Sequence, residues 1–348
     1  MVPEGLPGLD QARTAAWLTD HLDGEPPFSF ELIAAGGSNL TFRVTDTDGA
    51  VWALRRPPEG RTLATAHDVD REWRILGALS EAEVGVPVPG PLARCDDTDV
   101  TGAPFFVMEF MDGTILRTET DGDTLDARTG RTAAESLVSV QAALHSVDVD
   151  AIGLGDLGRR TGYVERQLHR WRTQVDRIDL RELPLVDELH HRLVASVPAD
   201  APQTSLVHGD YRFDNVVLGA DHRVTAVLDW ELCTLGDPTA DACWSLMYWA
   251  DPGDAESFLP SSPTLAASIP DRSWATHRYE QTAGRPLDDL GWFTAFGWWK
   301  MACIVEGVHA RRLAGARGGA ATADVATIAA DVDRMLVIAA EAAGATGI

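Results

Sequence analysis

The residues with the clearest chemical potential lie between positions 206 and 218, where two apolar runs flank a polar loop. Asp210 and Asn215 stand five positions apart in that loop. A further apolar run at 224–228 ends at Asp229, fourteen positions after Asn215. Carboxylate and amide oxygens at the ends of neighbouring strands are hard ligands, as Mg²⁺ with bound phosphates requires. The pattern indicates magnesium-dependent phosphate chemistry.

A hydrolytic metal site is an alternative use of the same loop. It would be built on His208, Asp210 and Asp214. No second histidine with ligand spacing accompanies His208, and oxygen ligands dominate the loop. The spacing therefore favours the magnesium–phosphate interpretation.

A small-residue turn near the N-terminus fits a phosphate-binding loop. Gly36, Gly37, Ser38 and Asn39 fall between two alternating β patterns. Glycines let backbone N–H groups approach a polyphosphate closely, and Ser38 adds a hydroxyl donor. A plain hairpin turn explains the same residues, so this segment alone does not decide between the two.

The third alternating run adds a cation. Ala53 and Arg55 are two positions apart and share one face of a strand. A small residue can lie flat against a base while the cation reaches phosphates. Glu72 falls within or beside the apolar stripe of the next helix, where a carboxylate needs a partner, and Arg55 is the natural candidate. The alternative is a Glu72 side chain that extends to solvent.

These segments together resemble the aminoglycoside phosphotransferase and choline kinase-like branch of the protein kinase-like fold, over essentially the whole chain. The loop with Asp210 and Asn215 carries the family's HGD-x-x-x-x-N signature without a substitution. The strings at 162–167, 229–231 and 235–238 are similar to a subgroup found as the kinase domain of acyl-CoA dehydrogenase fusions. The resemblance implies that Asp210 is the catalytic base and that Asn215 and Asp229 bind magnesium.

The resemblance also implies how a nucleotide is held. It places the phosphate loop at 36–39, a gatekeeper at Met108 and an adenine-binding hinge at the backbone of Glu109 and Met111. It implies ATP and Mg²⁺ as cofactors. Most kinases have lysine where this chain has Arg55, so the phosphate contact becomes a planar fork instead of a point charge.

Lysine is almost absent from the chain, which limits the residues that could supply the cation for the nucleotide phosphates. Lys300 is the single lysine among 29 basic residues. It lies in a late helical region, far in sequence from the phosphate loop. We therefore expect Arg55→Ala to weaken turnover with ATP much more than Lys300→Ala does.

Composition limits the partners. The 348 residues include 53 acidic side chains, and the formal net charge is −24. Phosphate polymers and anionic membrane surfaces would repel such a chain, so nucleic acid and membrane are not expected as partners. No long apolar run and no signal-peptide pattern is present, which predicts a cytoplasmic protein. The four cysteines lack a paired spacing and are expected as buried thiols. The oligomeric state is not indicated.

The elements that must position these residues follow from periodicity. Alternating runs predict an antiparallel β-rich N-terminal part, and the pattern after about 129 is mostly helical. The expected class is α+β, a two-lobed protein kinase-like fold. The N-terminal nucleotide-binding lobe is expected at 1–111, the hinge at about 109–114, and the catalytic and substrate-binding lobe at 112–348. Asp237 before Pro238 is expected as a helix cap, and His145 as a histidine in a buried network.

The expected reaction is transfer of the γ-phosphate of ATP to a hydroxyl of a small molecule. The subgroup implies a hydroxyacyl-CoA or hydroxy acid, which requires a basic patch. An aminoglycoside or another amino alcohol is the alternative and would need an acidic pocket. Arg166, Arg170 and Trp171 either contact the substrate or tie helices together. A nucleotide-binding pseudokinase is the alternative of another class, and the retained Asp210, Asn215 and Asp229 argue against it.

Overall fold

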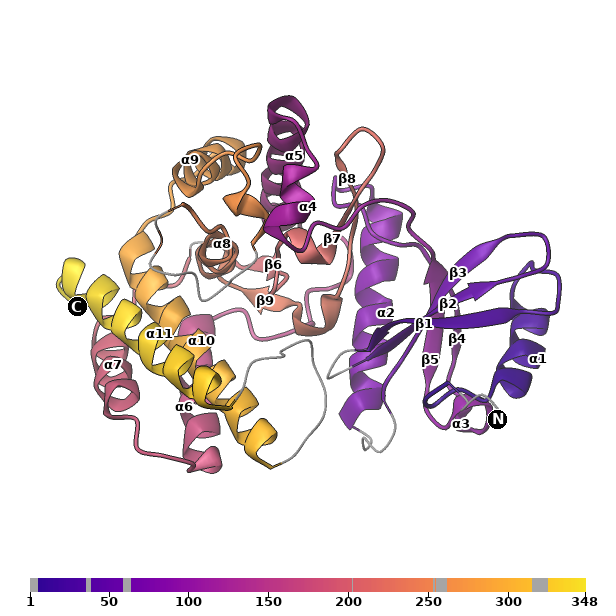
Figure 1. The fold of residues 1–348 in the computed structure, drawn as a ribbon, viewed down its shortest axis with the longest axis horizontal. Helices are drawn as coiled ribbons and strands as arrows, with labels where there is room; N and C mark the ends of the chain where they lie inside the picture. The colour runs from indigo at the N-terminus through magenta and orange to yellow at the C-terminus, as the bar shows by residue number, and fades with distance from the viewer. Residues whose placement is uncertain are drawn as a thin grey trace.

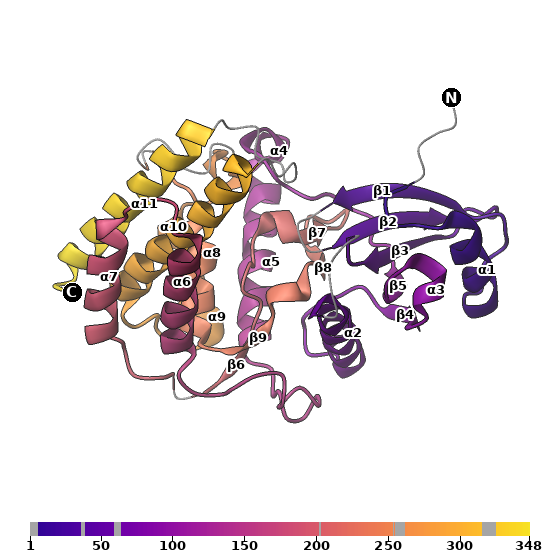
Figure 2. The ribbon, with the colours of Figure 1, turned by 90° about the horizontal axis from the view of Figure 1, so that it is seen from below.

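The structure is a computed structural model that describes residues 6–35, 39–58, 64–201, 203–252, 254, 262–314 and 325–348. A β-sheet with the helices packed against it occupies one end, and a larger helical assembly occupies the other (Figures 1 and 2). The expected α+β class, with antiparallel strands first and helices later, is confirmed.

The N-terminal sheet is antiparallel throughout and has the strand order β1-β2-β3-β5-β4. The strands are β1 (Ser29–Ala35), β2 (Leu40–Thr45), β3 (Val51–Arg56), β4 (Pro91–Cys95) and β5 (Phe105–Glu109), and the helices are α1 (Gln11–His21), α2 (Ala64–Ala82) and α3 (Thr98–Thr101).

The two faces of this sheet have different neighbours, because side chains alternate along each strand. Leu54 and Val107 belong to a core cluster with Leu18 of α1. Ala53 and Met108, one position away on the same strands, belong to the cluster that contains Val69 of α2 and Tyr211 of the loop after Asp210. The face that carries Ala53 is therefore the one turned toward the candidate site.

The C-terminal part is built from helices around two short antiparallel ladders. The helices are α4 (Glu119–Asp123), α5 (Ala127–His145), α6 (Tyr163–Ile178), α7 (Pro184–Ala195), α8 (Pro238–Met247), α9 (Arg272–Ala283), α10 (Leu290–Leu313) and α11 (Val325–Ala345). The ladders pair β6 (Ser205–Val207) with β9 (Thr234–Gly236) and β7 (Val216–Leu218) with β8 (Val224–Val227), and the 3-10 turns are η1 (Phe213–Asn215), η2 (Trp230–Leu232) and η3 (Pro263–Leu265).

The segment that follows β5 is tied to β7. Thr114 N donates to Leu218 O over 2.9 Å, and Leu218 N donates to Thr114 O over 2.8 Å. Gly113 allows this approach, since a Cβ at its position would lie 2.4 Å from Leu218 O. The chain thus passes from the sheet to the helical part directly beside the hairpin that carries the candidate site.

The expected burial of the cysteines and the expected helix cap at Asp237 are confirmed. All four cysteines are buried and free. Asp237 caps α8 and accepts from Thr239 N at 2.7 Å, with Pro238 in the first turn. Trp292 and Trp299 are buried in the core of the helical part. Among the described residues, no helix is both long and apolar enough to cross a bilayer.

Candidate functional site

The loop after β6 is held by its own histidine. His208 is fully buried, its Nε2 donates to Leu228 O over 2.9 Å, and its Nδ1 accepts from Asp210 N over 3.3 Å. Both ring nitrogens are therefore engaged by backbone. Within the described residues, no group of three or more His, Cys, Asp or Glu side chains is arranged to hold a metal ion. The hydrolase alternative built on His208 receives no support.

Asp210 and Asn215 are brought together as their spacing predicts. Asn215 Nδ2 donates to Asp210 Oδ2 over 3.0 Å and to Asp210 O over 2.8 Å. The turn η1 between them fixes this contact. Because the amide nitrogen is used in this way, the amide oxygen of Asn215 is the atom left to bind a cation.

Asp229 reaches the same place through the β7–β8 hairpin. Val216 pairs with Val227, and Leu228 N donates to Asn215 O over 2.8 Å. Asp229 follows with φ +64°, and its side chain is 37% exposed. Mg²⁺ is commonly held by one or two protein oxygen ligands plus phosphates and water. The donor set of Asn215 and Asp229 fits such an ion.

Arg55 pairs with Glu72, as predicted, and also reaches Asp229. Arg55 Nε donates to Glu72 Oε2 over 2.8 Å, and Nη2 donates to Asp229 Oδ1 over 2.5 Å. Glu231 Oε2 lies 3.9 Å from the same Nη2. One guanidinium thus joins α2, β3 and the segment that carries Asp229. The planar fork of an arginine makes two directed contacts here, whereas the ammonium of a lysine would act as a point charge.

Burial sets the titration of this pair. Glu72 is 2% exposed. Burial raises the pKa of Glu72 to about 7, although the neighbouring Arg55 charge acts to lower it. Burial lowers the pKa of Arg55, but the charges of Glu72 and Asp229 outweigh it and the net direction is upward. Arg55 is therefore charged at every physiological pH.

The predicted nucleotide-binding positions on the sheet lie side by side. Ala53 and Met108 are direct cross-strand partners, and both are buried. Glu109 exposes its side chain, which accepts from Gly90 N at 2.9 Å, and Met111 is half-buried. The predicted Gly36, Gly37 and Ser38 lie outside the described residues.

Asn39, the last residue of the predicted phosphate loop, is 6% exposed. Its Nδ2 donates to Glu231 Oε2 over 3.3 Å. The end of the loop is thereby tied to the same segment that carries Asp229. The contact brings the β1–β2 connection to the candidate site.

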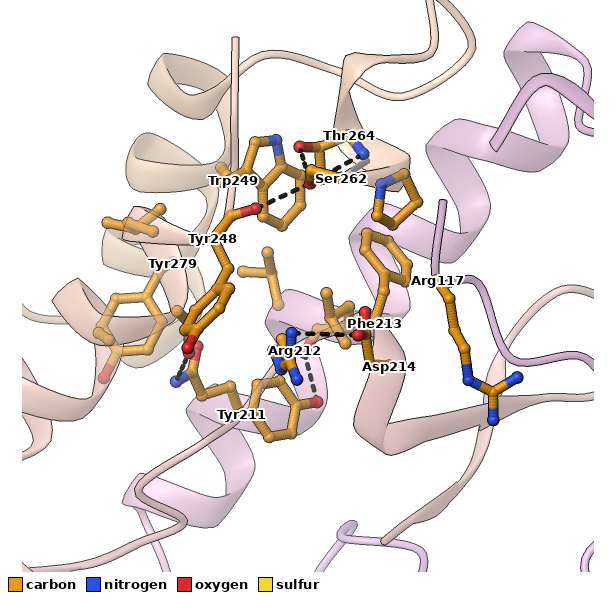
Figure 3. Close-up of a pocket in the computed structure, with 18 residues that line it drawn as sticks. Arg117, Tyr211, Arg212, Phe213, Asp214, Tyr248, Trp249, Ser262, Thr264 and Tyr279 are labelled. Carbon is orange, nitrogen blue, oxygen red and sulfur yellow. Dashed lines mark hydrogen bonds and ion pairs between the residues drawn. The ribbon is translucent and has the colours of Figure 1, made fainter. Parts of the chain in front are cut away.

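A mostly apolar pocket of about 210 Å³ adjoins the catalytic loop. It lies between α5, the loop after β6, α8, η3 and α9. Figure 3 shows the rings of Phe213, Tyr248 and Trp249 around the space, with Arg212 and Asp214 paired beside them. Arg212 Nε lies 3.5 Å from Asp210 Oδ1, and this guanidinium also stacks over the Tyr248 ring at 4.6 Å. The pocket is therefore adjacent to Asp210.

The charges around this pocket are few and mixed. Arg117, Arg212 and Asp214 are the charged side chains that line it. Burial raises the pKa of Asp214, and the charge of Arg212 opposes that rise. No ring of acidic side chains surrounds the pocket among the residues that the structure describes.

The three residues predicted for substrate contact have different surroundings. Arg166 donates to the backbone carbonyls of Thr161 and Arg159, which ties down the loop before α6. Trp171 donates to Gln167 within the same helix, over 3.0 Å. Arg170 is exposed and stacks over the Trp171 ring at 5.2 Å. These contacts favour a structural role for Arg166 at the start of its own helix, which is different from tying two helices together.

Asp241 is a buried carboxylate that sequence reasoning missed. It accepts from Gly209 N over 2.7 Å and from His208 N over 3.1 Å, and it contacts His145 Nε2 at 3.0 Å. The expected network role of His145 is thereby confirmed, and it continues to Tyr279 at 2.5 Å. A carboxylate within the otherwise apolar start of α8 was the available signal.

The groups around Asp241 favour its charged form. Burial raises this pKa, but the hydrogen bond and charge of His145, the charge of His208 and the hydrogen bond from Gly209 N lower it below the ordinary value. Asp241 is therefore an anion at neutral pH, and it fixes the backbone just before Asp210.

Lys300 was also missed as a site residue. It is 8% exposed, and its Nζ lies 3.8 Å from the centroid of the Trp244 ring. Trp244 Nε1 in turn donates to Asp210 Oδ1 over 3.5 Å. Trp244 thus connects the single lysine of the chain to Asp210, the candidate base. The occurrence of only one lysine in the sequence was the signal that could have identified it.

Comparison with known proteins agrees with the fold and the site. Residues 29–260 match the phosphotransferase enzyme family. Acyl-CoA dehydrogenase family member 11 of Gallus gallus is 34% identical over 318 residues, which are 88% of this chain and 40% of that protein. The chain thus spans well under half the length of that relative.

Solved structures show the same relationship. A Ralstonia eutropha protein assigned to the aminoglycoside phosphotransferases has 32% identity and a TM-score of 0.80, and the match covers 96% of this chain and 98% of that one. The streptomycin–ATP–APH(2″)-IIa complex has 14% identity and a TM-score of 0.59 over 94% and 96% of the chains, and it shares the fold. The chain belongs to the phosphotransferase enzyme family, as its motifs predicted.

Proposed function

We propose that the protein transfers the γ-phosphate of ATP, in a magnesium-dependent reaction, to the hydroxyl of a small hydroxy acid or its coenzyme A thioester. The contact between Asp210 and Asn215, with Asp229 joined to it through the β7–β8 hairpin, carries the proposal. This arrangement supplies one carboxylate for the acceptor and two oxygen ligands for a metal ion.

Each residue has a role that its contacts allow. In phosphoryl transfer the protein mainly positions groups and neutralises charge. Asp210 orients the acceptor hydroxyl and accepts its proton. Asn215 and Asp229 hold magnesium, which when bound neutralises charge on the phosphates. Arg55 keeps Asp229 in place through its Nη2 contact.

We assign the nucleotide to the space beside the Ala53 face of the sheet. Ala53 and Met108, which are buried cross-strand partners, contact the base, and the backbone at Glu109 and Met111 supplies the hinge contacts. Residues 36–39 form the phosphate loop. In this proposal 1–111 is the nucleotide-binding lobe and 112–348 is the catalytic and substrate-binding lobe.

The pocket beside Asp210 supports an apolar acceptor in preference to a polycation. Its aromatic lining includes Phe213 and Tyr248, and Arg117 and Arg212 outnumber the acidic Asp214. A cavity of about 150 Å³ is large enough for benzene, so 210 Å³ accommodates an alkyl chain of several carbons. Cationic aminoglycosides, the alternative class, would meet arginines there.

An acceptor panel tests this function. Purified protein with Mg²⁺ and labelled ATP is given 3-hydroxyoctanoyl-CoA, 3-hydroxyoctanoate, kanamycin and choline, and phosphate esters are detected by ³¹P NMR. We expect ester formation on a hydroxyacyl acceptor, and the Asp210→Asn variant should form that ester roughly 10²- to 10⁴-fold more slowly. Preferential phosphorylation of kanamycin would contradict the acceptor class. ATP binding without transfer to any acceptor would indicate a pseudokinase.

A further inference from the structure

Lys300 is a buried cation without an ion pair. Among the described residues, the structure gives its Nζ no hydrogen bond and no carboxylate within salt-bridge distance; its contact is the Trp244 ring at 3.8 Å. A charge in such a position is costly unless it is paired. A cation–π contact with one ring offsets only part of that cost. The ammonium therefore lacks an anion.

The charged groups around Lys300 do not supply that anion. Asp241 of α8 and Asp210 of the catalytic loop attract the ammonium, and Arg170 of α6 repels it. Asp241 is already used by two backbone N–H groups and His145. Asp210 is used by Asn215 and Trp244. Burial consequently lowers the pKa of Lys300 to about 8, and the two aspartates only partly offset this.

Lys300 is linked to the pocket and to Asp210 through its ring partner Trp244. Its ring partner Trp244 donates to Asp210, and Trp244 also makes an edge contact with Tyr248, with ring centroids 5.8 Å apart. Tyr248 lines the pocket of Figure 3. Arg55, the cation beside Asp229, is engaged by Glu72 on the other side of the site.

We propose that Lys300 binds an anionic oxygen of the phosphate acceptor and so selects acidic acceptors. The oxygen belongs to the carboxylate of a free hydroxy acid or to a phosphate of its coenzyme A thioester. This assignment rests on the proposed transfer to such an acceptor. It makes Lys300 an acceptor-binding residue, and Trp244 holds its ammonium beside Asp210.

Because the chain has one lysine, a titration can observe Lys300 alone. Protein that contains lysine labelled with ¹³C at Cε gives one side-chain NMR signal, whose pH dependence reports the pKa. The probes are 3-hydroxyoctanoate, 3-hydroxyoctanoyl-CoA and the uncharged N-acetylcysteamine thioester. An anion at hydrogen-bond distance favours the charged ammonium, so the recognised acid or CoA ester should raise the pKa by about one unit or more. The uncharged thioester should leave it unchanged.

Kinetics with the same three acceptors separates acceptor binding from other roles. Lys300→Met should lower kcat/KM about 10- to 100-fold for the recognised anionic acceptor, since hydrogen bonds to charged groups contribute about 1.5 to 3 kcal/mol. For the uncharged thioester, kcat/KM should change less than about threefold in the same variant. Lys300→Arg should retain part of the activity. Arg177→Met removes an exposed charge on α6 and serves as the control.

Two results would overturn the assignment. One is an equal loss with all three acceptors in Lys300→Met, which would mean that the lysine acts on the transferred phosphoryl group or on the fold. The other is a Lys300 pKa that no bound anionic probe moves. If the wild type phosphorylates none of the three acceptors, the proposed function fails, and the NMR titration still decides whether Lys300 binds an anion.

Discussion

Replacing Lys300 with methionine should make the protein more stable at neutral pH. The pKa of Lys300 lies at about 8 in the folded chain against an ordinary 10.5. Each unit corresponds to 1.36 kcal/mol, so the buried ammonium costs about 3 kcal/mol of the free energy of unfolding. The contact with Trp244 returns about 1 to 2 kcal/mol. Lys300→Met should therefore gain about 1 to 2 kcal/mol at pH 7, which raises Tm by about 2 °C for a chain of this size.

The pH dependence of this gain distinguishes it from a general packing effect. Above the unfolded pKa of 10.5, Lys300 is neutral in both the folded and the unfolded chain and does not destabilise the fold. The destabilisation develops as the pH falls from 10.5 to the folded pKa of about 8 and is complete below it. The wild type thus recovers stability between pH 8 and 10.5, whereas Lys300→Met does not. Urea denaturation of both proteins, followed by tryptophan fluorescence at pH 7 and 10, measures the difference. A variant less stable than the wild type at pH 7, or a difference independent of pH, would show that the buried ammonium does not destabilise the fold.

Three further predictions concern the site and its support. Arg55→Met should lower the free energy of unfolding by about 3 kcal/mol because Glu72 loses its cation. The double variant Arg55→Met with Glu72→Gln should recover most of that stability without recovering activity. Unchanged stability in the single variant would contradict this prediction. Asp241→Asn should cost about 2 kcal/mol at pH 7. Because the Asp241 pKa is lowered, its contribution is complete above the unfolded value of 3.8 and is lost below it, so the difference should shrink as urea titrations move from pH 6 toward pH 3; a constant difference would argue against an ionised anchor. Ser245→Phe should fill the pocket and raise KM for 3-hydroxyoctanoyl-CoA about tenfold while leaving KM for ATP unchanged, and equal changes in both would mean that the pocket does not hold the acceptor.

Much of the site was predictable because its residues are ordered by local rules. A strand places Ala53 and Arg55 on one face, and a helical stripe places Glu72 where it needs a cation. The hydrogen bond from Arg55 to Glu72 confirms the result of those two patterns. The spacing of Asp210 and Asn215 likewise spans one short loop, so their contact depends on little else.

The residues that were missed depend on contacts between distant segments. Asp241 is significant because α8 packs beneath the loop after β6, and no local pattern reports that packing. Lys300 was judged by its distance in sequence from the phosphate loop, but α10 brings it beside Trp244. Arg166 was ambiguous because a helix pattern does not show that the carbonyls of the preceding loop take up its guanidinium.

Asp210 is proposed to accept the proton of the acceptor hydroxyl, and the proposed transfer depends on this role. Its most direct test is the single-turnover rate of phosphoryl transfer in Asp210→Asn, measured beside the equilibrium affinity for ATP with magnesium. We predict a fall of roughly 10²- to 10⁴-fold in rate with nucleotide affinity largely kept. Asp221→Asn, an exposed turn carboxylate, is the matched control and should behave as the wild type. An Asp210→Asn variant that keeps most of its transfer rate would contradict the account.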